Sequence, residues 1–204
     1  MPSRFRALAR TLPLFAALTV FATCKPASAV VAVGDVAPAF TLTAAGGKTL
    51  SLADYRGKTV VLEWINPNCP FSRRQAVEKV MTTTSAKHQE VTWLAINSTR
   101  KGNADYLEPS QHAAWNQQHG IAYPVLYDAS GTTGQAYGAR TTPHMFIVDG
   151  AGKIVYIGAI DDHPSGRKSA AERTNYVDAA LTALASGKPV AMASTKSYGC
   201  SVKY

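Results

Sequence analysis

The chain has 204 residues, of which 46% are hydrophobic and 17% charged, and its formal net charge is +8 at pH 7. This length and composition are typical of one globular domain, at most two, with enough apolar residues to form a core. The basic residues form no long run or stripe, so the charge pattern argues against a nucleic-acid partner.

Residues 1–29 are typical of a secretory signal peptide. Three arginines lie in the first ten positions, an apolar stretch covers residues 12–23, and small residues for cleavage stand at 27–29. The apolar stretch is too short to span a bilayer as a helix. We therefore expect residues 30–204 to be exported, periplasmic or secreted, without stable membrane insertion after cleavage. An uncleaved anchor and a lipidated N-terminus at Cys24 are the alternatives.

Removal of this segment leaves two of the three cysteines, Cys69 and Cys200. Disulfides persist in exported proteins, so two cysteines indicate either one disulfide or a dithiol that cycles. No pattern of paired Cys and His indicates structural zinc, and neither a metal site nor a cofactor is predicted.

Hydrophobic patterns and turn residues predict the elements in chain order. Strands are expected at 40–43, 48–51, 59–65, 91–97, 124–127, 145–148 and 153–158, and helices at about 70–85, from a cap at Ser110 to Gly120, at 132–137 and at 175–186. Glycine-rich turns at 45–47 and 149–152 indicate two β-hairpins. Alternating strands and helices imply a sheet covered on both faces. The expected fold is α/β, a mixed central sheet flanked by helices, with an N-terminal β-hairpin extension and a C-terminal tail.

Cys69 lies between the apolar strand expected at 59–65 and the helix that begins near Pro70. A helix N-terminus carries unpaired N–H groups and a partial positive charge, and both favour a thiolate over a thiol. Arg73 and Arg74, in or near the first turn, add positive charge. The alternative is an inert buried cysteine. The order of strand, break, Cys-Pro and helix favours a reactive nucleophile.

Glu63 is the odd residue of its apolar strand, six positions before the cysteine. A carboxylate beneath a central strand would be desolvated, which raises its pKa. Such a group would move protons for the thiol of Cys69. The alternative is a glutamate near a sheet edge that reaches water.

Thr142 and Pro143 precede the strand expected at 145–148, and the peptide bond between them is a candidate for the cis form. A cis-proline loop at this position would face Cys69. This loop would offer the backbone of Thr142 to an extended partner chain; an ordinary trans turn is the alternative. Arg140 would stabilise a thiolate by charge, or be a solvated loop cation. His144 is more typical of a structural histidine than of a base or metal ligand. Residues 161–163, Asp-Asp-His, are expected to form a solvated loop.

Cys200 lies almost at the end of the chain, and its expected role is to resolve a mixed disulfide or a sulfenate formed on Cys69. Chain termini move readily, so a tail residue has the required reach. A permanent structural bridge and an unpaired thiol are the alternatives.

Three segments together resemble the redoxin group of the AhpC/TSA (alkyl hydroperoxide reductase/thiol-specific antioxidant) family, part of the thioredoxin-like superfamily. They are WINPNCPF at 64–71, YGARTTPHMF at 137–146 and the tail TKSYGCSVKY at 195–204, and the similarity extends over about 33–204. The resemblance implies a thioredoxin-like fold, with Cys69 as the nucleophile, Pro143 as the cis-proline and Glu63 in the place of the buried acid of thioredoxins.

The chain departs from the patterns of this superfamily at two points. Thioredoxins carry Cys-x-x-Cys, whereas here the fourth position is Ser72, which shifts the resolving role to Cys200 or an external thiol. Peroxiredoxins carry a proline and a threonine where this chain has Leu62 and Asn66. That difference argues against efficient peroxide reduction.

Three functions remain open from the sequence. The first is thiol–disulfide exchange with protein or small-molecule thiols and disulfides, in which Cys69 attacks and an external thiol reductant restores the dithiol. The second is a thiol peroxidase, in which peroxide oxidises Cys69 to a sulfenate that Cys200 resolves. The third is a non-catalytic copper-binding or chaperone module that uses Cys69, Cys200 and His144, because soft thiolates suit Cu(I).

Overall fold

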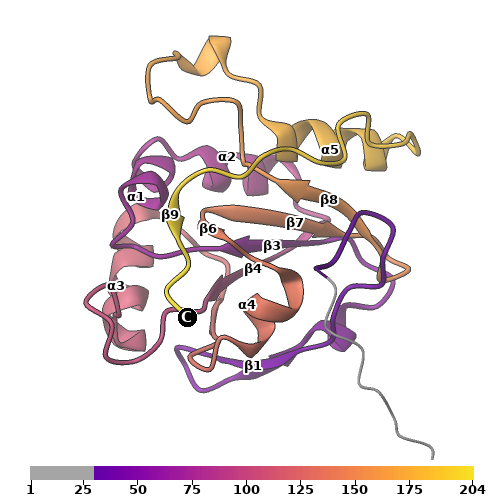
Figure 1. Cartoon of the computed structure of the whole chain (residues 1–204). Coiled ribbons are helices and arrows are strands. Elements are labelled where there is room, and N and C mark those ends of the chain that lie inside the picture. Colours follow the sequence, from indigo (N-terminus) through magenta and orange to yellow (C-terminus); the bar gives the residue numbers. More distant parts are fainter. Residues whose placement is uncertain (1–29) are drawn as a thin grey trace, which may run out of the picture.

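The computed structural model describes residues 30–204, and the predicted signal peptide and Cys24 lie outside the described residues. A seven-stranded sheet forms its centre, in the order β2-β1-β5-β4-β3-β7-β8 (Figure 1). Its strands are β1 (Thr41–Ala44), β2 (Thr49–Ser51), β3 (Val60–Trp64), β4 (Thr92–Asn97), β5 (Val125–Tyr127), β7 (His144–Val148) and β8 (Ile154–Gly158). β3, β4 and β5 are parallel, whereas β7 and β8 are antiparallel to their neighbours. The sheet is mixed, as the sequence predicts.

Helices cover both faces of this sheet. They are α1 (Pro70–Val77), α2 (Val80–Lys87), α3 (Pro109–His119), α4 (Thr132–Tyr137) and α5 (Tyr176–Ala185), with 3-10 turns at Leu52–Tyr55 and Ala170–Glu172. One core joins α2 and α5 to side chains such as Val61 and Ile147, and another joins α4 and the first hairpin to Leu62 and Phe146. Neighbouring residues of β3 point to opposite faces, so a strand buried on both sides reads as a continuous apolar run.

The single helix expected at 70–85 is in fact two helices. Lys79 has a left-handed backbone, with φ 54°, and separates α1 from α2. After this turn, Val80 and Met81 bury their side chains against Val61. The prediction of one helix rested on the spacing of apolar residues along the sequence. That spacing does not show the break at Lys79, after which α2 packs on the sheet.

The cap predicted for α3 is also wrong in detail. Glu108, rather than Ser110, is the capping residue, and it forms a reciprocal capping box with Gln111. The C-terminal end of this helix is as expected, because Gly120 adopts the left-handed conformation that closes a helix.

The C-terminal tail forms a strand that the sequence did not predict. β9 (Cys200–Ser201) pairs antiparallel with β6 (Thr141–Thr142), and the two make a small separate sheet. In this register Cys200 lies opposite Thr142, and Ser201 lies opposite Thr141. Figure 1 shows the yellow tail running from α5 past β6 to the C-terminus. The end of the chain is therefore brought to the loop that precedes β7.

Candidate active site

Cys69 lies at the carboxyl end of β3, where the chain turns into α1. It is the N-cap residue of that helix, and Pro70 occupies the first helical turn. The loop before it is held by Asn66, whose amide donates to Thr99 Oγ1 at 2.8 Å and whose side-chain oxygen accepts from the Asn68 N–H. These bonds pin the strand-to-helix turn, so the cysteine is presented from a rigid loop.

The sulfur of Cys69 contacts the loop before β7. Its Sγ lies 2.8 Å from the carbonyl oxygen of Thr142, and the peptide bond from Thr142 to Pro143 is cis, as the resemblance implied. Thr142 and Pro143 are both buried. Cys69 itself is 3% exposed, so reagents reach it only through movement of what covers it. The structure thus brings together three of the predicted site residues.

Opposing forces act on the ionisation of Cys69. Burial disfavours the thiolate and by itself raises the pKa of this thiol. Hydrogen bonds to the sulfur lower the pKa, and they come from the side chains of Cys200 and Thr142 and from the backbone of Ser72 and Cys200. Together they leave the pKa of Cys69 below its ordinary value. The contact to the Thr142 carbonyl is one that the protonated thiol makes as a donor, so the sulfur has a partner in either form.

Cys200 has the opposite tendency. Burial, and then its hydrogen bond and charge interaction with the Cys69 thiolate, raise the pKa of Cys200 to about 11. Both cysteines are free thiols, and Cys200 is the more exposed of the pair. A thiol of lowered pKa at Cys69 beside one of raised pKa at Cys200 is compatible with the attacking and resolving roles that the sequence predicts.

Glu63 lies on a central strand, so the sheet-edge alternative for this residue is wrong. It pairs with Ala95 of β4 on one side and with Met145 of β7 on the other, and it is 3% exposed. Burial raises the pKa of Glu63 to about 7, although the hydroxyl of Tyr123, which donates to its Oε2 at 2.8 Å, acts in the opposite direction. A carboxyl group with this pKa holds and releases a proton near neutral pH.

A small cavity lies between Glu63 and helix α1. Ser72, Gln75 and Ala76 of that helix line it together with Glu63 and Tyr123. The carboxyl group therefore lies behind the helix whose N-terminus carries Cys69.

Arg140 enters the site through its backbone. Its N–H donates to His144 Nδ1 at 3.2 Å, and its carbonyl accepts from the Val202 N–H at 3.0 Å. The Arg140 side chain is exposed and forms no hydrogen bond or ion pair with any residue from 30 to 204. Stabilisation of a thiolate by its charge stays a prediction.

His144 is a buried structural histidine, as the sequence favoured. Burial, and then the charge of Arg140, lower the pKa of His144 to about 4, so the ring is neutral at pH 7. Across the described part of the chain, no group of three or more His, Cys, Asp or Glu side chains is arranged to hold a metal ion.

The expectation of a solvated loop at 161–163 is wrong for two of its residues. Asp161 and His163 are each 1% exposed. The Asp161 carboxylate accepts from the Tyr198 hydroxyl of the tail and, at 3.2 Å, from Gln75 of α1, and Arg173 lies 3.6 Å away. Sequence reasoning missed this cluster because its members are far apart along the chain. The one available signal was the adjacent pair Asp161 and Asp162, and the tyrosine that binds Asp161 stands 37 positions later in the chain.

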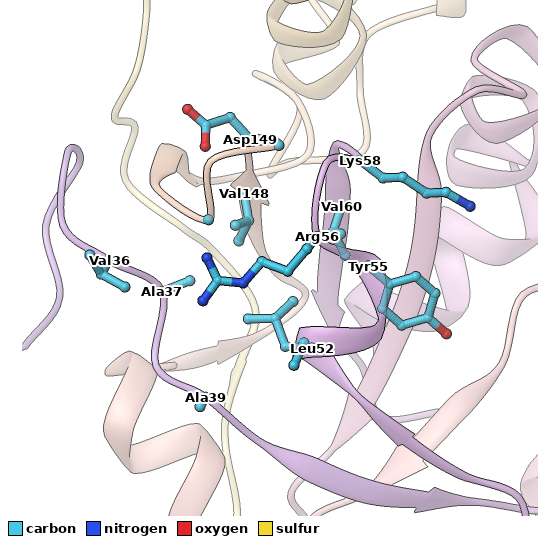
Figure 2. A pocket seen from close by; sticks show the side chains of 13 residues that line it. Val36, Ala37, Ala39, Leu52, Tyr55, Arg56, Lys58, Val60, Val148 and Asp149 are labelled. Atoms are coloured by element: carbon cyan, nitrogen blue, oxygen red, sulfur yellow. The ribbon is translucent and has the colours of Figure 1, made fainter.

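A separate pocket lies at the opposite end of β3 from the cysteine. Figure 2 shows Arg56 and Leu52 beside Val60, where β3 begins, and Val148, where β7 ends. β3 and β7 are antiparallel, so this pocket and Cys69 stand at opposite ends of the central strands. It contains none of the predicted site residues.

Comparisons with known proteins give a consistent result. The model of the AhpC/TSA family matches residues 33–157. Thiol-disulfide oxidoreductase ResA of Geobacillus thermodenitrificans is 30% identical over 146 residues, covering 70% of this chain and 79% of the relative. A Mycobacterium tuberculosis protein named provisionally as a peroxiredoxin is 30% identical over 134 residues, covering 60% of this chain and 81% of that protein.

Solved structures extend the similarity over more of the chain. A conserved protein from Geobacillus kaustophilus has a TM-score of 0.75 at 31% identity and covers 85% of this chain and 92% of its own. Thioredoxin-like neighbours from Bacteroides thetaiotaomicron and Chlorobium tepidum, at TM-scores of 0.51 and 0.52, share the fold. No helix within residues 30–204 has the length and hydrophobicity to cross a membrane.

Proposed function

Because the chain belongs to the AhpC/TSA family, we propose that it is an exported thiol–disulfide oxidoreductase in which Cys69 attacks and Cys200 resolves. The observation that carries the proposal is the pairing of β6 with β9, which sets Cys200 beside a nucleophile of lowered pKa. The name of the Geobacillus relative agrees with this activity. Export rests on the signal-like pattern of residues 1–29.

The reaction proceeds in two exchanges. The Cys69 thiolate attacks one sulfur of a substrate disulfide, and the other substrate sulfur leaves as a thiolate that takes up a proton. Cys200 then loses its proton and attacks Cys69 Sγ, which releases the second substrate thiol. The substrate disulfide is reduced to two thiols, and the protein dithiol is oxidised to a Cys69–Cys200 disulfide. An external thiol reductant restores the dithiol.

Glu63 is the proposed proton carrier of this cycle. Cys200 has a raised pKa and must be deprotonated before it attacks, and the leaving thiolate must be protonated. A carboxyl group with a pKa of about 7 serves both directions. Glu63 is buried behind α1, and the small cavity that it shares with Ser72 and Gln75 is the proposed route by which its proton is exchanged.

Two further residues are proposed to act on the substrate side. The backbone of Thr142, next to Pro143, is proposed to bind an extended substrate chain beside the attacking sulfur, because the Thr142 carbonyl lies 2.8 Å from Cys69 Sγ. The guanidinium of Arg140, exposed at the start of this loop, is proposed to favour the thiolate by charge.

Peroxide reduction is the second candidate, and the peroxiredoxin-like relative favours it. The Cys69 thiolate would attack a peroxide oxygen, giving a sulfenate and an alcohol or water, and Cys200 would condense with the sulfenic acid with loss of water. Rapid mixing of the reduced protein with peroxide separates the candidates. Loss of the Cys69 thiol no faster than that of free cysteine excludes a peroxidase.

Two cysteine variants test the main proposal. Cys69→Ser should abolish disulfide reduction, whereas Cys200→Ser should retain the first exchange and accumulate a mixed disulfide on Cys69, seen by mass spectrometry as a mass increase. Activity that is unchanged in Cys69→Ser would contradict the proposal. Mass spectrometry of the protein recovered from its producing cell also shows whether it begins at residue 30.

A further inference from the structure

The last residues of the chain cover a strand edge beside the nucleophile. Within the described residues, β6 has one strand partner, β9, and the Val202 N–H continues the pairing by donating to the Arg140 carbonyl at 3.0 Å. A strand without a partner presents free N–H and C=O groups that bind an extended chain. The tail therefore occupies the edge that another extended polypeptide would need in order to reach Cys69.

Gly199 shows how close this docking is. Its φ of +136° is rarely adopted by residues with a side chain, and a Cβ built at this position would lie 2.1 Å from the Thr142 carbonyl oxygen. Only glycine permits the tail backbone to pass here. The position next to Cys200 is thus built for contact with the Thr142 loop.

A half-buried tyrosine, Tyr198, fastens the tail on one side of Cys200. The Tyr198 hydroxyl donates to the Asp161 carboxylate and accepts from Gln75 Nε2 at 2.7 Å. The Tyr198 ring packs on Phe71, with 5.9 Å between ring centroids. Gln75 and Phe71 both belong to α1, the helix capped by Cys69. This contact ties the tail to the same helix that presents the nucleophile.

A second tyrosine fastens the tail on the other side. The Tyr204 hydroxyl donates to the Ala139 carbonyl at 2.6 Å. Its ring lies against Gly131 and Gly134, where an added Cβ would come within 2.7 Å and 2.6 Å of ring carbons. The Lys203 carbonyl also accepts from a backbone N–H, that of Arg100, at 2.9 Å. Cys200 is therefore held between two anchored aromatic residues.

From these contacts we infer that residues 198–204, here called the strap, are a built-in occupant of the partner-binding edge, with Tyr198 and Tyr204 as positioning residues. The inference rests on the proposed function, because it concerns access to the same cysteine pair. A small thiol or disulfide needs only a local movement of the cover over Cys69 to react, whereas an extended polypeptide must first displace the whole strap. The Cys69–Cys200 disulfide fastens the strap covalently, so displacement is confined to the reduced protein.

The experiment compares an extended peptide with a small reagent. Gly199→Ala releases the strap, because its Cβ cannot share space with the Thr142 carbonyl. Ser201→Ala, in the same strand with an exposed side chain, is the matched control. Both are made in a Cys200→Ser background, so that the mixed disulfide on Cys69 persists. The probes are 5,5′-dithiobis(2-nitrobenzoate) and the mixed disulfide of thionitrobenzoate with a short cysteine-containing peptide.

Release of the strap should raise the peptide rate more than the small-reagent rate. Release of the strap breaks at least the hydrogen bond from the Val202 N–H to the Arg140 carbonyl. Because the loss of one such bond changes an equilibrium by about tenfold, we expect the ratio of the two rates to rise about tenfold in Gly199→Ala. The ratio should be unchanged in Ser201→Ala. A ratio that is equal in Gly199→Ala and Ser201→Ala overturns the inference. Absence of any reaction at Cys69 in the unsubstituted chain overturns instead the proposed function.

Tyr198→Phe supplies an independent measurement, and it decides the question if Gly199→Ala does not fold. This change keeps the ring on Phe71 and removes only the hydroxyl that bonds to Asp161. With Cys200 retained, equilibration against glutathione should show a Cys69–Cys200 disulfide about tenfold easier to reduce, which is about 30 mV. An unchanged equilibrium constant would show that the hydroxyl does not position the strap. A residue with a purely structural role would lower the melting temperature without this shift.

Discussion

Replacement of the buried carboxyl group by Glu63→Gln should change the pH dependence of stability. Burial raises the pKa of Glu63 from 4.5 to about 7 in the folded protein. The folded state therefore binds a proton more tightly than the unfolded chain, and stability falls as pH rises from 4.5 through 7. By linkage, the ionised carboxylate destabilises the fold by about 3 kcal/mol at pH 8 and by nearly nothing below pH 4.5. A neutral glutamine carries no such penalty.

Urea unfolding of the reduced protein at pH 5 and pH 8 measures this difference. Glu63→Gln should be more stable than the unsubstituted chain by about 3 kcal/mol at pH 8, and the gain should shrink to less than about 1 kcal/mol at pH 5. Glu90→Gln is the control, because the Glu90 side chain is 63% exposed and its replacement should matter little at either pH. The same stability difference at both pH values would refute the reasoning. Slower resolution of the mixed disulfide in Glu63→Gln would in addition support proton transfer by this group.

Three more outcomes are expected. Cys200→Ala should raise the pKa of Cys69, because a hydrogen bond that lowers this pKa is lost, and the pH profile of iodoacetamide alkylation should then move to higher pH. Cys200→Ser keeps a hydrogen-bond donor and should move the profile less. Identical profiles for the two variants and the unsubstituted chain would contradict this prediction. The ring of His144, with a pKa lowered to about 4, should stay neutral from pH 5.5 to 8, and NMR signals that titrate near pH 6.5 would disprove it. Asn66→Ala should lower the free energy of unfolding by about 2 kcal/mol, because the buried Asn66 side chain holds the loop before the cysteine through several hydrogen bonds. Asn68→Ala removes one side-chain hydrogen bond of this loop and should lower the free energy of unfolding by less, as measured by urea unfolding.

Local signals predicted most of the elements. The apolar run at 59–65, the glycine-rich turns at 45–47 and 149–152 and the helix at 132–137 all occur close to their expected positions. Such features depend on periodicity and turn chemistry within a few residues. The break at Lys79 was missed because it depends on how α2 fits the sheet, which no local pattern records.

The chemistry of the site was visible before its geometry. Cys69 before a helix start and Glu63 inside an apolar strand are recognisable from neighbouring residues, because a helix N-terminus favours a thiolate and a carboxylate is unusual in an apolar run. Whether Glu63 was central or at an edge depended on the strand order, and the pairing with β4 and β7 decided it.

By itself, the sequence determined the class of fold and indicated Cys69 and Glu63 as the candidate nucleophile and the candidate proton carrier, since each stands out from the residues adjacent to it along the chain. Only the tertiary structure decided where the tail lies. Cys200 pairs opposite Thr142, and the Tyr198 hydroxyl donates a hydrogen bond to the Asp161 carboxylate. These two contacts join residues that are 58 and 37 positions apart in the chain. The position of the tail depends on backbone hydrogen bonds between distant segments and on the space left where glycines lack a side chain. Neither produces a pattern among residues that are neighbours in the sequence.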